Sequence, residues 1–340
     1  MKADMNKKLW KTLLCSAVAV FTLIGCGEKK TSNYNVLEDE FDYLITVGFS
    51  QGGPESDWRT ANTESLKSTL IEENGYELIL EDAQEDQERQ IEALREFVKK
   101  DVDYIVLSPV VETGWDTVLK EIKEANIPVI IINNPIEEDD SLYECWLGSD
   151  FTKEGKMAAD WLEQYLEEQE RTEEEINLTT IQGPIGTLAQ TERTEGFMKA
   201  IQDNPNWIML AQQTGEASKK TGKEVMALFL ETHSNIDVVI AENDEMAFGA
   251  IEAIKDAGKT CGPKGDIIVI SYGAGKKELE AMKAGELNAA VECNPLYGPK
   301  IAEIIQKLDS GVSLDKKQYV DEAYFDTSMD LDEALTVRKY

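Results

Sequence analysis

The chain has 340 residues, 34 of them Lys or Arg and 66 of them Asp or Glu, and its formal net charge is −32. This acidity argues against a nucleic-acid-binding protein, because contacts to phosphates require a basic surface. The single histidine, His233, excludes metal sites built on two imidazoles, such as the HExxH zinc site. With 42% hydrophobic residues the chain is able to bury one large core or two of ordinary size.

The N-terminus predicts an export signal. Several lysines precede the uncharged run Thr12–Gly25, which suits a signal-peptide core and is shorter than the roughly 20 residues that span a bilayer. The run ends in Leu-Ile-Gly-Cys, which resembles a bacterial lipobox, so we expect cleavage before Cys26 and lipidation of its thiol. Residues 1–25 are then a lipoprotein signal peptide. Residues 26–42 are polar and without periodicity, as is typical of a tether.

The remaining cysteines do not form a disulfide framework. Cys15 lies in the predicted signal, which leaves Cys145, Cys261 and Cys293 in the folded part. Three is an odd number and the spacings are wide, so we expect buried or free thiols with at most one bridged pair. No histidine lies near any of them in sequence, so a catalytic cysteine is not predicted.

From Tyr43 onward, short apolar runs alternate with amphipathic helical stretches. Runs of this length and composition predict parallel strands covered on both faces. The predicted strands are Tyr43–Phe49, Tyr76–Leu80, Tyr104–Leu107 and Pro128–Ile132. Helical stripes occur at Ile91–Val98 and Trp115–Ile122, and Trp115 is assigned to the core. This winding predicts a parallel sheet with right-handed crossovers.

The same alternation occurs again in the second half. The predicted strands are Ile176–Ile181, Trp207–Ala211, Asp237–Ala241 and Ile267–Ile270. The predicted helices are Thr152–Glu168, Leu188–Gln202, Ser218–Glu231 and Glu245–Asp256. The chain is therefore predicted to be an α/β protein with two doubly wound lobes.

Residues that follow the predicted strands point to a sugar site. Ligands of doubly wound sheets bind beyond the carboxyl ends of the strands. Planar amide and guanidinium groups suit neighbouring hydroxyls, and an aromatic ring suits the C–H face of a sugar. These loops contain too few basic residues for a phosphate. The groups of this kind are Glu55, Asp57, Trp58, Arg59, Asn133, Asn134, Gln182 and Asn243.

Seven blocks, in order, resemble the ribose/galactose-type periplasmic substrate-binding proteins, and within them the galactofuranose-binding members of sugar ABC importers. The blocks are VGFSQGGPESDWR (47–59), SPVVETGW (108–115), IPVIIINN (127–134), and the stretches 149–162, 182–197, 242–254 and 288–299. The resemblance implies the type I periplasmic binding protein fold, in which three crossing segments form the hinge. By analogy, residues 43–149 and about 295–321 form the N-terminal lobe, and 150–294 and about 322–340 form the C-terminal lobe.

The resemblance also implies site residues. Trp58 is the expected stacking platform, Arg59 a hydroxyl bridge, Arg193 the guanidinium of the second lobe and Asn243 an amide contact. The implied ligand-binding residues are Glu55, Ser56, Asp57, Trp58, Arg59, Asn134, Arg193 and Asn243, with Ser50, Gln51, Asn133, Gly273 and Asn294 as further candidates. We expect Trp58→Ala or Arg193→Ala to abolish sugar binding with little change in melting temperature.

Two positions depart from the family pattern. Close relatives carry Asp-Arg where this chain has Asn133-Asn134, and Asp where it has Gly273. Both losses remove charged, bidentate partners from the site, and the missing Asp would cost a ligand two charge-assisted hydrogen bonds of roughly 1.5–3 kcal/mol each. We therefore expect a pentose or hexose with furanose preference, or else a larger substituent in the space left open at Gly273.

The predicted function is that of a lipid-anchored extracytoplasmic solute-binding protein. It would bind a monosaccharide between two closing lobes and deliver it to ABC permease subunits, as a monomer on the outer face of the cytoplasmic membrane. No cofactor, metal or nucleic acid is expected. Two alternatives stay open: a sugar sensor for a membrane kinase, and a glycosidase that uses Glu55 and Asp57.

Overall fold

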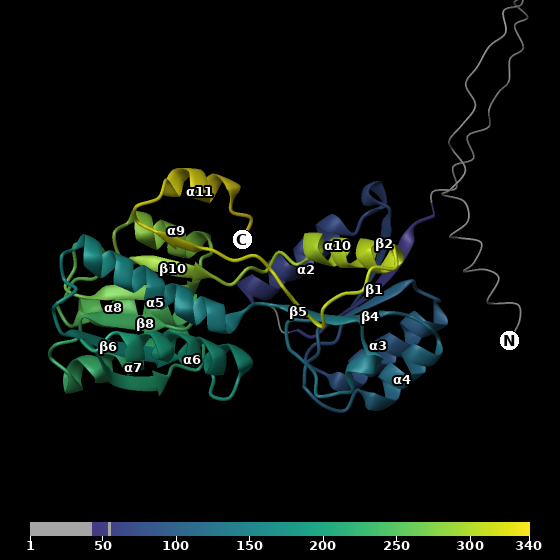
Figure 1. The fold of residues 1–340 in the computed structure, drawn as a ribbon, viewed down its shortest axis with the longest axis horizontal. Helices are drawn as coiled ribbons and strands as arrows, with labels where there is room; N and C mark the ends of the chain where they lie inside the picture. The colour runs from purple at the N-terminus through teal and green to yellow at the C-terminus, as the bar shows by residue number, and fades with distance from the viewer. Residues whose placement is uncertain (1–42, 54–55) are drawn as a thin grey trace, which may run out of the picture. The chain divides into compact units, whose positions relative to one another are not determined.

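The computed structural model describes residues 43–53 and 56–340. The predicted signal peptide, the tether, Cys26 and Glu55 lie outside the described residues. The described part contains two six-stranded sheets, in the orders β11-β5-β4-β3-β1-β2 and β12-β10-β9-β8-β6-β7. Each sheet has helices on both faces (Figure 1), as expected for doubly wound α/β lobes.

The first sheet is entirely parallel. Its strands are β1 (Ile45–Gln51), β2 (Tyr76–Asp82), β3 (Tyr104–Leu107), β4 (Val129–Ile132), β5 (Cys145–Gly148) and β11 (Lys317–Tyr319). One face packs against α2 (Asp57–Thr69) and α10 (Gly298–Asp309). The other packs against α3 (Gln87–Lys99) and α4 (Asp116–Glu124). Short 3-10 turns occur at Glu72–Asn74 and Asp140–Leu142.

The second sheet is parallel except at one edge, where β12 runs antiparallel to β10. Its strands are β6 (Ile176–Gln182), β7 (Trp207–Thr214), β8 (Val238–Ala241), β9 (Ile268–Gly273), β10 (Ala289–Glu292) and β12 (Tyr324–Asp326). On one face lie α5 (Phe151–Glu168) and α6 (Leu188–Asp203). On the other lie α7 (Lys219–Thr232), α8 (Asp244–Asp256), α9 (Lys276–Lys283) and α11 (Leu331–Val337).

All the predicted strands and helices are present, with ends that differ by a few residues. Strands β1, β2 and β7 run past their apolar stretches because polar residues continue to pair with the neighbouring strand. Strands β5, β10, β11 and β12 were not predicted. They are only three or four residues long, and β10 begins with two alanines, which have weak strand propensity.

Helices α5 and α6 cross with their backbones in contact. A Cβ at Gly155 would lie 2.2 Å from the carbonyl oxygen of Arg193, and one at Gly196 would lie 2.2 Å from that of Thr152. Real Cβ atoms do not come this close, so both positions require glycine. The crossing brings the first two turns of α5 against the middle of α6.

The predicted core and thiol assignments are confirmed. Trp115 is fully buried among the residues that pack α3 and α4 on the first sheet. Cys145, Cys261 and Cys293 are free thiols, the first two of them buried. Among the described residues, no helix combines the length and the apolar character that a membrane crossing requires.

Candidate functional site

Residues at the carboxyl end of β1 are buried and engaged with protein. Ser50 Oγ accepts a hydrogen bond from Gln90 Nε2 at 3.2 Å, and Gln90 Nε2 also reaches the carbonyl of Ser108 at 2.9 Å. Gln51 donates to Thr63 Oγ1 at 2.9 Å. Ser50 and Gln51 therefore shape this edge of the sheet rather than present free groups to solvent.

Arg59 extends this network from the first turn of α2. Its Nη1 donates to Gln51 Oε1 at 2.8 Å and lies 3.4 Å from Ser108 Oγ. Ser56 is the N-cap of α2, and its hydroxyl accepts from the Arg59 backbone N–H at 3.1 Å. The helix thus begins at the end of the β1 loop and holds the guanidinium over the strand ends.

The neighbours of Arg59 have different surroundings. Asp57 is exposed and forms an ion pair with Lys277 Nζ at 2.7 Å. Trp58 is half-buried, and its Nε1 donates to the Cys293 carbonyl at 2.9 Å. Its ring meets Tyr297 edge-on, with centroids 5.6 Å apart. These contacts hold the indole in one orientation, as a stacking platform requires.

The Asn133-Asn134 pair follows β4. Asn133 has a φ of 65°, a left-handed conformation that asparagine tolerates, and its carbonyl accepts from Trp146 Nε1 at 3.0 Å. Asn134 is exposed and donates from Nδ2 to the Pro109 carbonyl at 3.1 Å. Both residues therefore lie at the carboxyl edge of the first sheet.

Arg193 is the centre of the corresponding edge of the second sheet. Its Nε donates to Glu154 Oε2 at 2.6 Å, and its Nη1 donates to the Glu242 carbonyl at 2.8 Å. The guanidinium lies between the rings of Phe151 and Tyr272, at 5.0 and 4.8 Å from their centroids. Only 7% of the residue is exposed, so the guanidinium is held rigidly.

Two residues after β8 complete this edge. The carboxyl group of Glu242 accepts from the Gly183 backbone N–H at 2.8 Å and from Thr194 Oγ1 at 2.7 Å, and burial raises the pKa of this carboxyl. Asn243 is the N-cap of α8; its Oδ1 accepts from the Met246 N–H at 2.8 Å. The Asn243 amide thus already serves the helix start.

The space at Gly273 is not open, contrary to the sequence-based expectation. Gly273 has a φ of 141°, and a Cβ there would lie 2.9 Å from Glu278 Oε2. That oxygen accepts from the Gly275 N–H at 2.7 Å, and the other contacts Ser271 Oγ. The carboxyl of Glu278 therefore occupies the position where a larger ligand substituent was expected.

The three segments that connect the two sheets meet at one partly buried carboxyl, that of Glu322. Its Oε1 accepts from Ser149 Oγ at 2.6 Å and from the Asn294 N–H at 3.0 Å. Asn294 also donates from Nδ2 to the Asp321 carbonyl at 3.0 Å. Asn294, a candidate ligand contact, therefore joins two crossing segments to each other.

One group among the described residues has the spacing of a metal site. The ligating atoms of Glu154, Cys293 and Glu322 all lie within 4.8 Å of one another. Burial raises the pKa of the Cys293 thiol and that of Glu322, the latter to about 9. Burial also raises the pKa of Glu154, a rise that Arg193 opposes. Burial therefore favours the protonated forms of Cys293 and Glu322.

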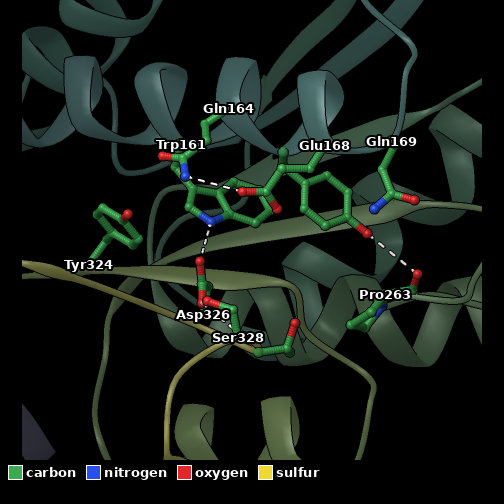
Figure 2. Close-up of a pocket in the computed structure, with 10 residues that line it drawn as sticks. Trp161, Gln164, Glu168, Gln169, Pro263, Tyr324, Asp326 and Ser328 are labelled. Carbon is green, nitrogen blue, oxygen red and sulfur yellow. Dashed lines mark hydrogen bonds between the residues drawn. The ribbon is translucent and has the colours of Figure 1, made fainter.

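A separate pocket lies between α5 and β12 (Figure 2). Its Trp161 and Tyr165 rings stack with centroids 4.9 Å apart, and Trp161 Nε1 donates to Asp326 Oδ2 at 2.8 Å. Asp326 pairs with Ala289, the first residue of β10. The pocket is therefore near the amino end of β10, away from the strand ends where doubly wound sheets bind ligands.

Sequence reasoning missed Glu154, Glu322 and Gln90. A single charged residue within an amphipathic helix is normally solvated, so Glu154 gave no signal. Glu322 follows a three-residue strand that was not predicted either. Glu242 could have been predicted as a site residue, because it directly follows a predicted strand.

Comparisons with known proteins agree with the two-lobe fold. The family model described as "Periplasmic binding protein domain" matches residues 47–308. The galactofuranose-binding protein YtfQ of Escherichia coli K12 is 42% identical over 260 residues, which cover 75% of this chain and 79% of the relative.

Two solved structures are also similar. A Mycobacterium smegmatis protein in complex with β-D-fucofuranose is 39% identical with a TM-score of 0.72, over 86% of this chain and 95% of the other. The binding protein of the arabinose ABC transporter of Shewanella sp. ANA-3, bound to α- and β-L-arabinofuranose, is 37% identical with a TM-score of 0.74 over 86% and 95%.

Proposed function

This chain belongs to the periplasmic binding protein family, and from that premise we propose that it binds a furanose sugar for an ABC importer. The observation that carries the proposal is that relatives of 37–42% identity are named for, or bound to, furanoses. The rigid Trp58 ring and the Arg59 and Arg193 guanidinium groups supply the stacking surface and planar donors that a sugar needs.

The proposed site joins the carboxyl edges of both sheets. The N-terminal lobe comprises residues 43–149 and about 295–321, and the C-terminal lobe comprises 150–294 and about 322–340. A sugar stabilises the closed arrangement because only there do both lobes contact it. The Ser149, Asn294 and Glu322 cluster lies where the crossing segments meet and would serve as the hinge.

The proposed ligand contacts divide into two groups. Trp58, Arg59, Asn134 and Arg193 are the stronger candidates, together with Glu55, which lies outside the described residues. Ser56 and Asn243 cap helices at the rim of the site, so they contribute through the helix starts. Ser50, Gln51, Asn133, Gly273 and Asn294 support the site through their backbone and side-chain contacts.

The molecule acts outside the cytoplasm, anchored through a lipid on Cys26. The predicted signal peptide and lipobox support this location. The bound sugar passes unchanged to permease subunits, and the chain works as a monomer. A glycosidase is less well supported, because Asp57 is paired with Lys277 on the surface.

A sensor function has weaker support than import. The fructose-binding domain of a hybrid two-component system is only 23% identical, a level at which likeness shows the fold alone. The relatives with higher identity are named for binding or import.

Calorimetric titration of the purified mature chain tests the proposal. D-Galactose, D-fucose and L-arabinose populate furanose forms in solution and are expected to bind. D-Glucose, which is almost wholly pyranose, is the control. Heat of binding from D-glucose alone, or no response to any of the three furanose-forming sugars, would show that the proposed ligand class is wrong.

A further inference from the structure

The carboxyl edge of the second sheet gathers several carboxyl groups around one guanidinium. Glu154 on α5 is 0% exposed and Glu242 after β8 is 3% exposed. Arg193 contacts the side chain of the first and the backbone of the second. A buried carboxylate is costly unless it is paired, so Arg193 and Glu154 depend on each other.

The orientation of Arg193 leaves one set of donors for a ligand. Nε and Nη1 are engaged with Glu154 and Glu242, and the two aromatic rings fix the plane of the guanidinium. No described residue accepts a hydrogen bond from Nη2, and 9% of the Arg193 side chain is exposed. Nη2 is therefore the atom of Arg193 that is able to reach a ligand.

The ion pair of Arg193 and Glu154 has no net charge. Glu154 Oε2 takes the ion pair, and Glu154 Oε1 is buried without a hydrogen-bond partner among the described residues. An uncharged sugar meets a hydrogen-bond donor whose positive charge is already balanced. A sugar acid whose carboxylate approached Nη2 would also approach Glu154 and Glu242, where no unpaired guanidinium compensates its charge.

We propose that Glu154 is a positioning and selectivity residue, which orients Arg193 towards uncharged sugars and excludes sugar acids. The inference rests on the proposed function, since it places the sugar beside Arg193. Glu154 does not touch the ligand; it acts through the guanidinium. A carboxylate partner for the ligand-binding arginine thus sets the charge class of the substrate.

The test compares Glu154→Gln with the wild type, because glutamine keeps an acceptor for Arg193 Nε and removes only the charge. Dissociation constants are measured by calorimetry for D-galactose and D-galacturonate, which differ only at C6. Ring equilibria of the free sugars cancel when the variant is compared with the wild type. Glu121→Gln is the matched control, since Glu121 pairs with Arg95 on the exposed surface.

The expected result is a shift of at least tenfold in the ratio of the two dissociation constants towards galacturonate in Glu154→Gln and none in Glu121→Gln. Equal changes for both sugars, or no change, would overturn the selectivity role while leaving furanose binding by the wild type intact. Tighter binding of galacturonate than of galactose by the wild type would overturn it too.

If Glu154→Gln does not fold, the double variant Glu154→Gln/Arg193→Gln replaces it, because that variant buries no unpaired charge. It is expected to remain folded and to bind galacturonate no better than the wild type does. Gain of galacturonate binding in the double variant would contradict the proposal, since the guanidinium would not be its source. Absence of binding of any neutral sugar by the wild type would instead refute the proposed function.

Discussion

At the scale of single residues, the ligand candidates are held by protein contacts before any ligand arrives. Trp58 donates to a backbone carbonyl, and Arg193 is paired with a fully buried carboxylate. Such residues contribute to stability as well as to binding. The expectation that their removal leaves the melting temperature nearly unchanged is therefore not supported by these contacts.

Arg193→Ala is predicted to lower the free energy of unfolding by about 3–5 kcal/mol at pH 7. The reason is that Glu154 would be left as a buried charge without its partner. Urea unfolding followed by circular dichroism measures the change. Arg95→Ala, which removes an arginine from an exposed ion pair, is the control and is expected to change stability far less. Similar losses in the two variants would contradict the assignment of a buried pair.

Gly273→Ala is predicted to destabilise the fold by roughly 1–3 kcal/mol. Its φ of 141° is accessible to glycine, and a Cβ would lie 2.9 Å from Glu278 Oε2. Gly285→Ala is a useful comparison, because Gly285 has a φ of 75° with nothing within 4 Å of a Cβ. Thermal unfolding of both variants compares a positive-φ position that faces a side chain with one that faces open space. A larger loss at Gly285 would show that Glu278 moves aside easily.

At the scale of elements, helix starts and crossing segments position the site. N-caps at Ser56, Asp150, Thr187 and Asn243 begin α2, α5, α6 and α8 close to strand ends. The glycine contact of α5 with α6 then brings Glu154 to Arg193. The crossing segments converge on Glu322, whose protonation state affects all three.

Glu322 predicts a pH dependence of stability. Burial raises its pKa to about 9 from an ordinary 4.5, so the folded chain keeps a proton that the unfolded chain releases in this interval. The contribution of Glu322 to the free energy of unfolding is complete below pH 4.5. It decreases as the pH rises towards 9, by at most about 1.4 kcal/mol per pH unit for this one group.

Urea unfolding of Glu322→Gln and the wild type at several pH values from 5 to about 9 checks this dependence. The variant is expected to lose less stability with rising pH than the wild type. Glu167→Gln changes an exposed carboxylate on α5 and serves as the control. Parallel stability profiles for wild type and Glu322→Gln would contradict a proton held at the crossing segments.

At the scale of the whole molecule, the predicted lipid anchor would keep the folded part at the membrane. Residues 43–53 and 56–340 supply the two lobes, and the predicted lipid on Cys26 supplies the anchor. The proposed sugar site and the predicted anchor lie in different parts of the chain.

Cys26→Ser is predicted to abolish lipid attachment without altering sugar affinity. Phase partition in a cloud-point detergent separates the lipidated from the unmodified protein, and mass spectrometry identifies the acylated N-terminal peptide. Cys15→Ser is the control, because Cys15 lies inside the predicted signal. Recovery of Cys26→Ser in the detergent phase with an acylated N-terminus would rule out Cys26 as the lipid attachment site.

The sequence alone determined the α/β winding, the two lobes and the strand ends that we propose as the ligand site. Apolar periodicity and capping residues are local properties, so they can be recognised within a few positions of the chain. The tertiary structure decided which side chains meet. Glu154 and Arg193 are 39 positions apart, and Ser149 and Glu322 are 173 apart. Their pairing depends on how helices cross and where connecting segments converge, which no local pattern encodes.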